Sequence, residues 1–139
     1  MIEHRVVAGT VELHVEVSGK GVPVFLLHGL GLRGQLWNRV RQSFGPGYQL
    51  VVVDLRSAGR STETQREELS LARWADDLEA VRQKLGIDRP VLVGHSLGGS
   101  IALKYALEHP EHVGALVLIG AEANLSNLAP RMNSSAERI

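Results

Sequence analysis

The chain has 139 residues, of which 44% are hydrophobic, and this is enough for one domain with a buried core. Fifteen lysines and arginines balance fifteen aspartates and glutamates without long blocks of either sign, so we expect no nucleic-acid partner. The absence of cysteine excludes disulfides, thiolate nucleophiles and thiolate metal ligands. No apolar run reaches the roughly 18 residues of a membrane span, and the N-terminal residues lack an apolar signal region. We therefore expect a cytoplasmic protein without a membrane partner.

The N-terminal residues are predicted to form a hairpin. Residues 11–17 alternate apolar and polar side chains, which is the pattern of a half-exposed strand, and a turn near Gly9 separates them from residues 5–8. Four later runs are apolar without alternation, and they begin at Val22, Tyr48, Pro90 and Ala115. Continuous runs rich in β-branched residues are typical of strands that are covered on both faces, as in a parallel sheet.

Helical segments are expected between these strands. Leu36, Val40 and Phe44 share one face of a short helix, and a later helix covers about residues 97–109. The order is therefore a hairpin followed by β-α-β-α-β-α-β, which predicts an open α/β sheet. Residues 123–139 form a polar tail without periodicity, which we expect to be the start of a cap or a disordered segment.

The longest helix is predicted over residues 71–85. Its apolar residues recur at helical spacing, Ser70 is placed to cap its start, and Gly86 is placed to end it. We expect its charged residues to form a solvated face without a chemical role; they are Asp76, Asp77, Glu79, Arg82 and Lys84.

The segment HGLGLRG, residues 28–34, admits two interpretations. Its three glycines have the G-x-G-x-x-G spacing of a dinucleotide-binding turn, and Asp54 stands where the ribose-binding acid of such a site would lie. The same residues could instead form a loop that stabilises an oxyanion. The preceding hairpin, the position of His28 before the first glycine and the serine turn described next favour the second interpretation. We therefore expect no dinucleotide and no other cofactor.

The sharpest local signal is the G-x-S-x-G motif at residues 94–98, where a predicted strand meets a predicted helix. A serine on a strained strand-to-helix turn projects its hydroxyl from the end of the sheet. Such a turn leaves no space for side chains two residues to either side, which accounts for Gly94 and Gly98. The motif therefore indicates that Ser96 is a nucleophile.

Three motifs together resemble the N-terminal part of an α/β-hydrolase-fold protein of the esterase, lactonase and haloperoxidase-like branch. They are residues 28–31 (HGLG), 54–61 (DLRSAGRS) and 94–98 (GHSLG), each after an apolar run. The resemblance covers residues 1–122. It implies a mostly parallel sheet with an N-terminal hairpin, of which the first six strands are present and the last two strands and the cap are missing.

The resemblance also assigns roles to individual residues. Ser96 is the implied nucleophile, and the backbone N–H groups of Leu30 and Leu97 form the implied oxyanion hole. Structural support is implied for His28, Gly29, Asp54, Gly94, His95 and Gly98.

Side chains at two positions narrow the implied reaction. Dehalogenases and epoxide hydrolases of this fold carry aspartate where Ser96 stands, and epoxide hydrolases carry proline where Gly31 stands. The remaining chemistry is acyl transfer, in which Ser96 attacks an ester, thioester or lactone carbonyl and water later releases the acyl group. A small acyl compound is therefore the expected substrate. The family usually has glycine at the position of Ser57, so the resemblance does not determine the backbone geometry of that turn.

The acid and the base of the expected triad are not evident. In this fold the acid usually follows the seventh strand and the histidine follows the eighth, whereas this chain has six predicted strands. Glu122, just past the last of them, is the candidate acid, with a surface glutamate as the alternative. Asp54 lies near the same edge but is expected to fix the turn after its strand.

The histidines are expected to have structural positions. His4 and His14 fall on the surface of the hairpin, and His109 and His112 fall at the sheet edge opposite the nucleophile. His28 lies at the correct edge and is expected to brace the oxyanion loop, with service as the base as the alternative. No two histidines are four residues apart, and we expect no metal site.

Three hypotheses about function follow. The first, which we favour, is a serine hydrolase whose N-terminal portion is weak or inactive by itself. The second is a split hydrolase or homo-oligomer, in which a second chain docks on the exposed edge of the strand at residues 115–120. The third is a non-catalytic binding module that uses the cavity near Ser96.

Overall fold

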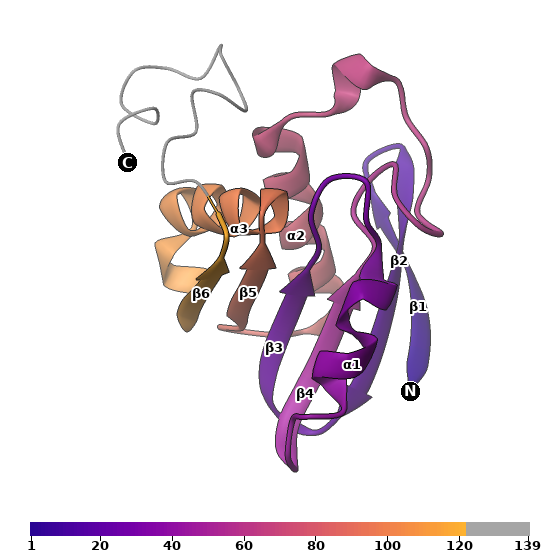
Figure 1. The fold of residues 1–139 in the computed structure, drawn as a ribbon. Helices are drawn as coiled ribbons and strands as arrows, with labels where there is room; N and C mark the ends of the chain where they lie inside the picture. Colours follow the sequence, from indigo (N-terminus) through magenta and orange to yellow (C-terminus); the bar gives the residue numbers. More distant parts are fainter. Residues whose placement is uncertain (122–139) are drawn as a thin grey trace.

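The computed structural model describes residues 1–121, so Glu122 and the predicted tail at residues 123–139 lie outside the described part. In this part, six strands form one sheet in the order β1-β2-β4-β3-β5-β6 (Figure 1). β1 (Ile2–Ala8) and β2 (Val11–Gly19) form the predicted antiparallel hairpin. The other strands are β3 (Gly21–Leu27), β4 (Gly47–Val53), β5 (Val91–His95) and β6 (Ala115–Ile119), and they run parallel to one another. The predicted open, mostly parallel α/β sheet with an N-terminal hairpin is confirmed.

Helices lie on both faces of this sheet. α2 (Leu71–Leu85) and α3 (Leu97–Glu108) pack together on one face, and α1 (Asn38–Arg41) lies on the other (Figure 1). Three short 3-10 helices complete the described elements: η1 (Gly34–Trp37), η2 (Arg66–Glu68) and η3 (Pro110–His112). No helix within residues 1–121 has the length and apolar character needed to cross a bilayer.

The central strands are buried on both faces. Alternate residues of β3 and β4 point to opposite sides, as the two-residue period of a strand requires. Phe25 and Val51 join the large cluster beneath α2 and α3, whereas Val24 and Val52 join a smaller cluster that includes Trp37. Burial on both sides explains why these runs are apolar without alternation.

α2 begins and ends where the sequence predicts. The Ser70 hydroxyl accepts a hydrogen bond from the Arg73 N–H over 3.1 Å, and Gly86 ends the helix in the left-handed conformation at φ 65°. The prediction that the charges of α2 form a solvated face is wrong for Asp77, which is buried.

The first predicted helix also differs from expectation. Leu36 and Val40 are exposed, and the buried residue is Trp37. The reason is that residues 34–37 form a 3-10 helix, followed by a single α-helical turn. With three residues per turn, a spacing of four no longer places side chains on one face.

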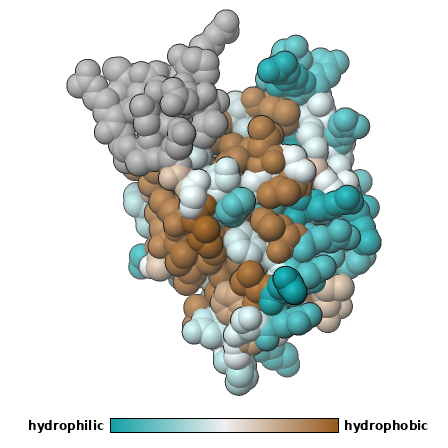
Figure 2. Space-filling model, in the orientation of Figure 1, coloured by the Kyte–Doolittle hydropathy of each residue, from teal (hydrophilic) through white to brown (hydrophobic). Residues whose placement is uncertain are grey.

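The described sheet ends at an apolar edge strand. In β6, Val117, Leu118 and Ile119 are all exposed, although strand residues of this kind are usually buried. Figure 2 shows the hydrophobic surface over β5 and β6.

Candidate active site

Ser96 occupies the turn between β5 and α3, and its backbone is strained. Its φ of 53° and ψ of −118° lie outside the regions that L-residues normally adopt. Three backbone hydrogen bonds hold it: its N–H donates to the Ile119 carbonyl over 2.9 Å, and its carbonyl accepts from the N–H groups of Gly99 (2.9 Å) and Ser100 (3.2 Å). The side chain is exposed and makes no capping bond to α3. The turn therefore presents, at the C-terminal end of β5, a hydroxyl that makes no hydrogen bond to any of residues 1–121.

The flanking glycines have no room for a side chain. A Cβ on Gly94 would overlap the Gly98 carbonyl, and a Cβ on Gly98 would overlap the Leu27 carbonyl and lie 2.6 Å from that of His28. The first contact packs α3 against β5, and the second packs α3 against β3. The two glycines thus allow the approach of helix and strands that produces the sharp turn at Ser96.

The loop at residues 28–34 lies directly beside this serine. A Cβ on Gly29 would lie 3.3 Å from Ser96 Cβ and 3.2 Å from His95 Nδ1, so even one methyl group would crowd the turn. Leu30 follows, with its side chain exposed. The structure therefore brings the first and third predicted motifs together at one edge of the sheet.

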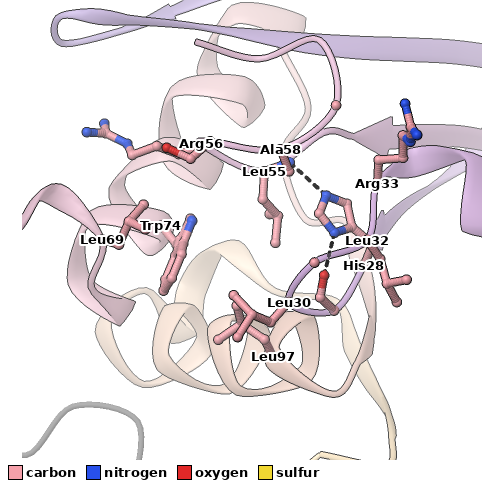
Figure 3. A pocket seen from close by; sticks show the side chains of 14 residues that line it. His28, Leu30, Leu32, Arg33, Leu55, Arg56, Ala58, Leu69, Trp74 and Leu97 are labelled. Carbon is pink, nitrogen blue, oxygen red and sulfur yellow. Dashed lines mark hydrogen bonds between the residues drawn. The ribbon is translucent and has the colours of Figure 1, made fainter. Parts of the chain in front are cut away.

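A cavity of about 270 Å³ opens next to this contact (Figure 3). The predicted oxyanion residues Leu30 and Leu97 both line it, and Ser96 lies beside it, one residue before Leu97. The rest of the wall combines apolar side chains with polar ones: Leu32, Leu55, Ala58, Leu69 and Trp74 on one hand, His28, Arg33, Arg56 and Ser57 on the other. Ser96 is not itself a lining residue; it adjoins the cavity through Leu97 and through Gly29, where a Cβ would lie 3.3 Å from Ser96 Cβ.

His28 braces the loop as a neutral imidazole. The Leu55 N–H donates to Nε2 over 3.0 Å, so this nitrogen carries the lone pair, and Nδ1–H donates to the Gly29 carbonyl over 2.8 Å (Figure 3). Burial lowers the pKa of His28 below its ordinary value, which keeps the ring uncharged. Because both ring nitrogens are occupied, His28 has no free lone pair for a serine proton.

Asp54 ties the same loop to the end of β4. Its carboxylate accepts hydrogen bonds from the N–H groups of Gly34 (2.6 Å) and Arg60 (3.0 Å), and its carbonyl accepts from the Ser61 hydroxyl (2.5 Å). A Cβ on Gly59 would overlap this carboxylate. Asp54 therefore holds two loops in place and lies in their interior, as the sequence predicts for a residue that fixes the turn.

Ser57 adopts the conformation for which the family uses glycine. Its φ is 64°, in the left-handed region. The Ser57 hydroxyl accepts a hydrogen bond from the Thr64 N–H over 2.8 Å and lies 3.0 Å from the Thr64 hydroxyl. Ser57 therefore holds a left-handed conformation that favours glycine, and a side-chain hydrogen bond accompanies the strain.

The buried ion pair of Arg56 and Asp77 was not anticipated from the sequence. Two parallel hydrogen bonds of 2.9 and 2.8 Å join the guanidinium to the carboxylate, and both side chains are 5% exposed. The bonds to Asp77 raise the pKa of Arg56 above its ordinary value. The pair fastens the loop after β4 to α2. A signal was present, because position 77 is three residues after Trp74 and four before Val81, on the buried face of the helix.

The histidines lie mostly where the sequence places them. His109 and His112 are at the far end of α3, and His4 is half-buried on the hairpin. The expectation that His14 is on the surface is wrong: it is buried on a face of β2 where residues 33–35 and 59–60 lie beside it, and its backbone N–H donates to the Ser61 hydroxyl over 2.9 Å. The Nδ1 atom of His95 is buried without a hydrogen-bond partner among residues 1–121.

A parallel sheet in which a strand ends at a strained, exposed serine, next to a His-Gly loop, defines the α/β-hydrolase class of protein. The pattern of the alpha/beta hydrolase fold family matches residues 22–137, and the chain belongs to this family.

Three known proteins illustrate the similarity. The proposed carbamate hydrolase RutD of Caulobacter vibrioides is 35% identical over 120 residues, which are 83% of this chain and 45% of that protein. Est816, an N-acyl homoserine lactone degrading enzyme, superposes with a TM-score of 0.82 at 32% identity, covering 92% of this chain and 49% of the other. A variant of a proposed epoxide hydrolase of Pseudomonas aeruginosa superposes with a TM-score of 0.83 at 30% identity, covering 96% of this chain and 45% of that protein. The chain spans less than half the length of each.

Proposed function

We propose that this chain carries the nucleophile of a serine hydrolase that cleaves an ester, thioester or lactone through an acyl-enzyme on Ser96. The observation that carries the proposal is the strained, exposed hydroxyl at the end of β5, beside a cavity that the Leu30 loop and Leu97 share. Membership of the α/β-hydrolase family supports hydrolysis as the class of reaction.

The reaction starts when Ser96 Oγ attacks the carbonyl carbon of the substrate while its proton passes to a base. The carbonyl oxygen becomes an oxyanion, to which the backbone N–H groups of Leu30 and Leu97 donate. Losing one such donor typically slows turnover about 100 to 1,000-fold. The alcohol, thiol or ring oxygen then leaves with a proton, and water releases the acyl group from Ser96.

The base is the part of the triad that this chain does not supply. All six histidines fall within the described residues, and their ring hydrogen bonds go to Glu16, to Gly29 and to the Leu55 N–H, not to Ser96. We therefore infer that the catalytic histidine belongs to a further polypeptide segment. Glu122 stays the candidate acid and lies outside the described residues. Serine hydrolases without their triad partners keep only ~1,000 to 10,000-fold acceleration over water, so we expect a very slow enzyme.

The similarity to a proposed epoxide hydrolase does not alter the assignment of the nucleophile. Epoxide opening in this fold uses a carboxylate at the elbow, and this chain has the hydroxyl of Ser96 there. A hydroxyl with a nearby oxyanion loop suits a carbonyl that becomes tetrahedral.

The test is hydrolysis of p-nitrophenyl acetate by the purified chain, with Ser96→Ala as the inactive variant and Ser43→Ala, at an exposed serine, as the control. A fluorophosphonate probe measures nucleophilicity on the same samples. We expect slow hydrolysis and labelling that Ser43→Ala retains and Ser96→Ala abolishes. Equal rates and equal labelling in all three proteins would refute Ser96 as the nucleophile.

A complementing chain is a second candidate, and the exposed apolar edge of β6 favours it. A further strand pairing there would cover Val117 and Ile119 and could bring a histidine to the edge where Ser96 lies. The mass of the purified protein in solution tests this. A defined oligomer with rapid, Ser96-dependent turnover would support completion by a second chain, and a monomer would exclude self-complementation.

A further inference from the structure

A second cluster of chemically active side chains lies at the opposite end of α3 from Ser96. It contains Glu79 on α2, His109 just after α3 and His112 in η3. One ring nitrogen of each histidine and one carboxylate oxygen of Glu79 lie within 4.8 Å of one another. The 12 residues of α3 separate the cluster from Ser96 by about 18 Å along the helix axis, so it belongs to no part of the hydrolase site.

The two imidazole rings are arranged side by side. Their centroids are 5.6 Å apart with 11° between the ring planes, and Tyr105 packs against His109 at 4.9 Å. Both histidine side chains are 27% exposed and that of Glu79 is 16% exposed, so the cluster is held by packing but open to solvent.

One nitrogen of His112 is buried without a hydrogen bond. Nδ1 has no partner within the described part of the chain and lies 3.4 Å from Glu79 Oε2. The other nitrogen, Nε2, lies 3.7 Å from a carboxylate oxygen of Glu111. A proton on Nε2, facing Glu111, leaves the Nδ1 lone pair directed toward Glu79.

The carboxylate of Glu79 is ionised and fixed in place. Hydrogen bonds from Arg82 lower the pKa of Glu79 to about 2, and the Tyr105 hydroxyl also donates to it. A bound cation would therefore not have to displace a proton from Glu79. The positive charge of Arg82 opposes a second cation nearby and reduces its affinity.

We propose that Glu79, His109 and His112 form a binding site for one divalent transition-metal ion of the zinc type. Two imidazole nitrogens and one carboxylate oxygen are ligands that Zn²⁺ takes at about 2.0–2.2 Å, with water available for the fourth position. A tetrahedral ion would draw the ligand atoms to roughly 3.3 Å from one another, a movement of about 1 Å for side chains with partial solvent access. The ion would replace the Tyr105 hydrogen bond at the Glu79 carboxylate.

Such an ion would connect segments that are distant in sequence. Glu79 is 30 residues before His109, and the ion would hold the middle of α2 to the segment between α3 and β6. An ion that binds the folded state and not the unfolded state raises stability with its concentration. The site is therefore structural, at the edge of the sheet away from the cavity.

The experiment is calorimetric titration of the 139-residue chain, purified without a histidine tag, with zinc chloride. His109→Ala and His112→Ala each remove one ligand at a partly exposed position, and His4→Ala removes a histidine outside the cluster. Circular dichroism verifies that each variant is folded. Thermal unfolding with and without the metal gives a readout that is independent of hydrolysis.

We expect one ion per chain with a micromolar Kd and a higher Tm in saturating zinc. The His109 and His112 variants should bind at least about tenfold more weakly, and His4→Ala should bind as the unsubstituted chain does. Absence of binding would overturn the proposal. So would full binding by the double His109→Ala, His112→Ala variant, which would place the ion elsewhere, for example at Glu3, His14 and Glu16.

Discussion

The Leu55 N–H donates a hydrogen bond to Nε2 of His28, and this single bond of 3.0 Å determines the tautomer of a buried imidazole. The proton must then be on Nδ1, which reaches the Gly29 carbonyl in the loop beside Ser96. The ring connects the loop after β3 with the loop after β4 and cannot be protonated without breaking the bond from Leu55.

This relationship predicts a pH dependence of stability. The pKa of His28 is lowered in the folded state, so the unfolded chain binds the proton more tightly, and folding stability falls as the pH drops below about 6.5. The stabilisation is complete above that pH and is lost by at most about 1.4 kcal/mol per pH unit. Urea unfolding between pH 5 and 8 measures it. The side chain in the His28→Gln variant does not titrate, so the free energy of unfolding of this variant should change less with pH. Identical pH dependence in both proteins would contradict a lowered pKa of His28 in the folded state.

Gly98 is predicted to tolerate no side chain. Gly98→Ala puts a methyl group onto the Leu27 carbonyl, and we expect a loss of about 3 kcal/mol or more in the free energy of unfolding. Gly45→Ala is the matched control, because a Cβ there meets nothing within 4 Å and its effect should stay within about 1 kcal/mol. Chemical denaturation compares the two, and similar stabilities would show that α3 does not pack against β3 as described.

Substitution of Asp77 is predicted to lower the free energy of unfolding far more than substitution of the other acidic residues of α2. Asp77→Ala removes both hydrogen bonds from the buried Arg56 guanidinium and leaves only the exposed Glu68 carboxylate 3.7 Å away; breaking a buried pair typically costs about 3–5 kcal/mol. The double variant Arg56→Met, Asp77→Leu removes both charges and should recover most of that loss. Chemical denaturation compares the free energy of unfolding of the single variant with that of the double variant. A double variant as unstable as Asp77→Ala would contradict this account.

Ser57 offers a way to separate strain from hydrogen bonding. Ser57→Ala loses the bond from the Thr64 N–H but keeps a Cβ at φ 64°, whereas Ser57→Gly loses the bond and relieves the strain. We expect Ser57→Gly to be more stable than Ser57→Ala by about 1 kcal/mol, after the higher entropy of glycine in the unfolded chain is included. Thermal unfolding of both variants decides the order, and the reverse order would mean that the turn changes shape.

The features predicted correctly from the sequence are those that a local pattern specifies. The apolar runs around Val22 and Tyr48 give the buried strands, and Ser70 with Gly86 gives the ends of α2. Contacts between distant segments were not predictable in this way. Position 77 had the spacing of a buried residue, but nothing local shows that Arg56 lies 21 residues earlier on a loop that folds onto it.

The difference between local patterns and long-range contacts also separates the Ser96 site from the cluster of Glu79, His109 and His112. The parts of the Ser96 site each carry a motif, and the common edge of parallel strands brings them together. Glu79 and His112 have no motif, because they meet only through the packing of α2 on α3. His14 was placed on the surface because alternation alone does not show that distant segments, at residues 33–35 and 59–60, lie against the polar face of β2.

The backbone N–H of Ser96 donates a hydrogen bond to the carbonyl of Ile119, the last residue of β6. The backbone of the proposed nucleophile is thereby anchored to the outermost strand of the described sheet. A displacement of that strand, by a polypeptide that pairs with it or by its fraying, is transmitted to the serine through one hydrogen bond. The position of the Ser96 hydroxyl therefore depends on how the edge strand β6 is held.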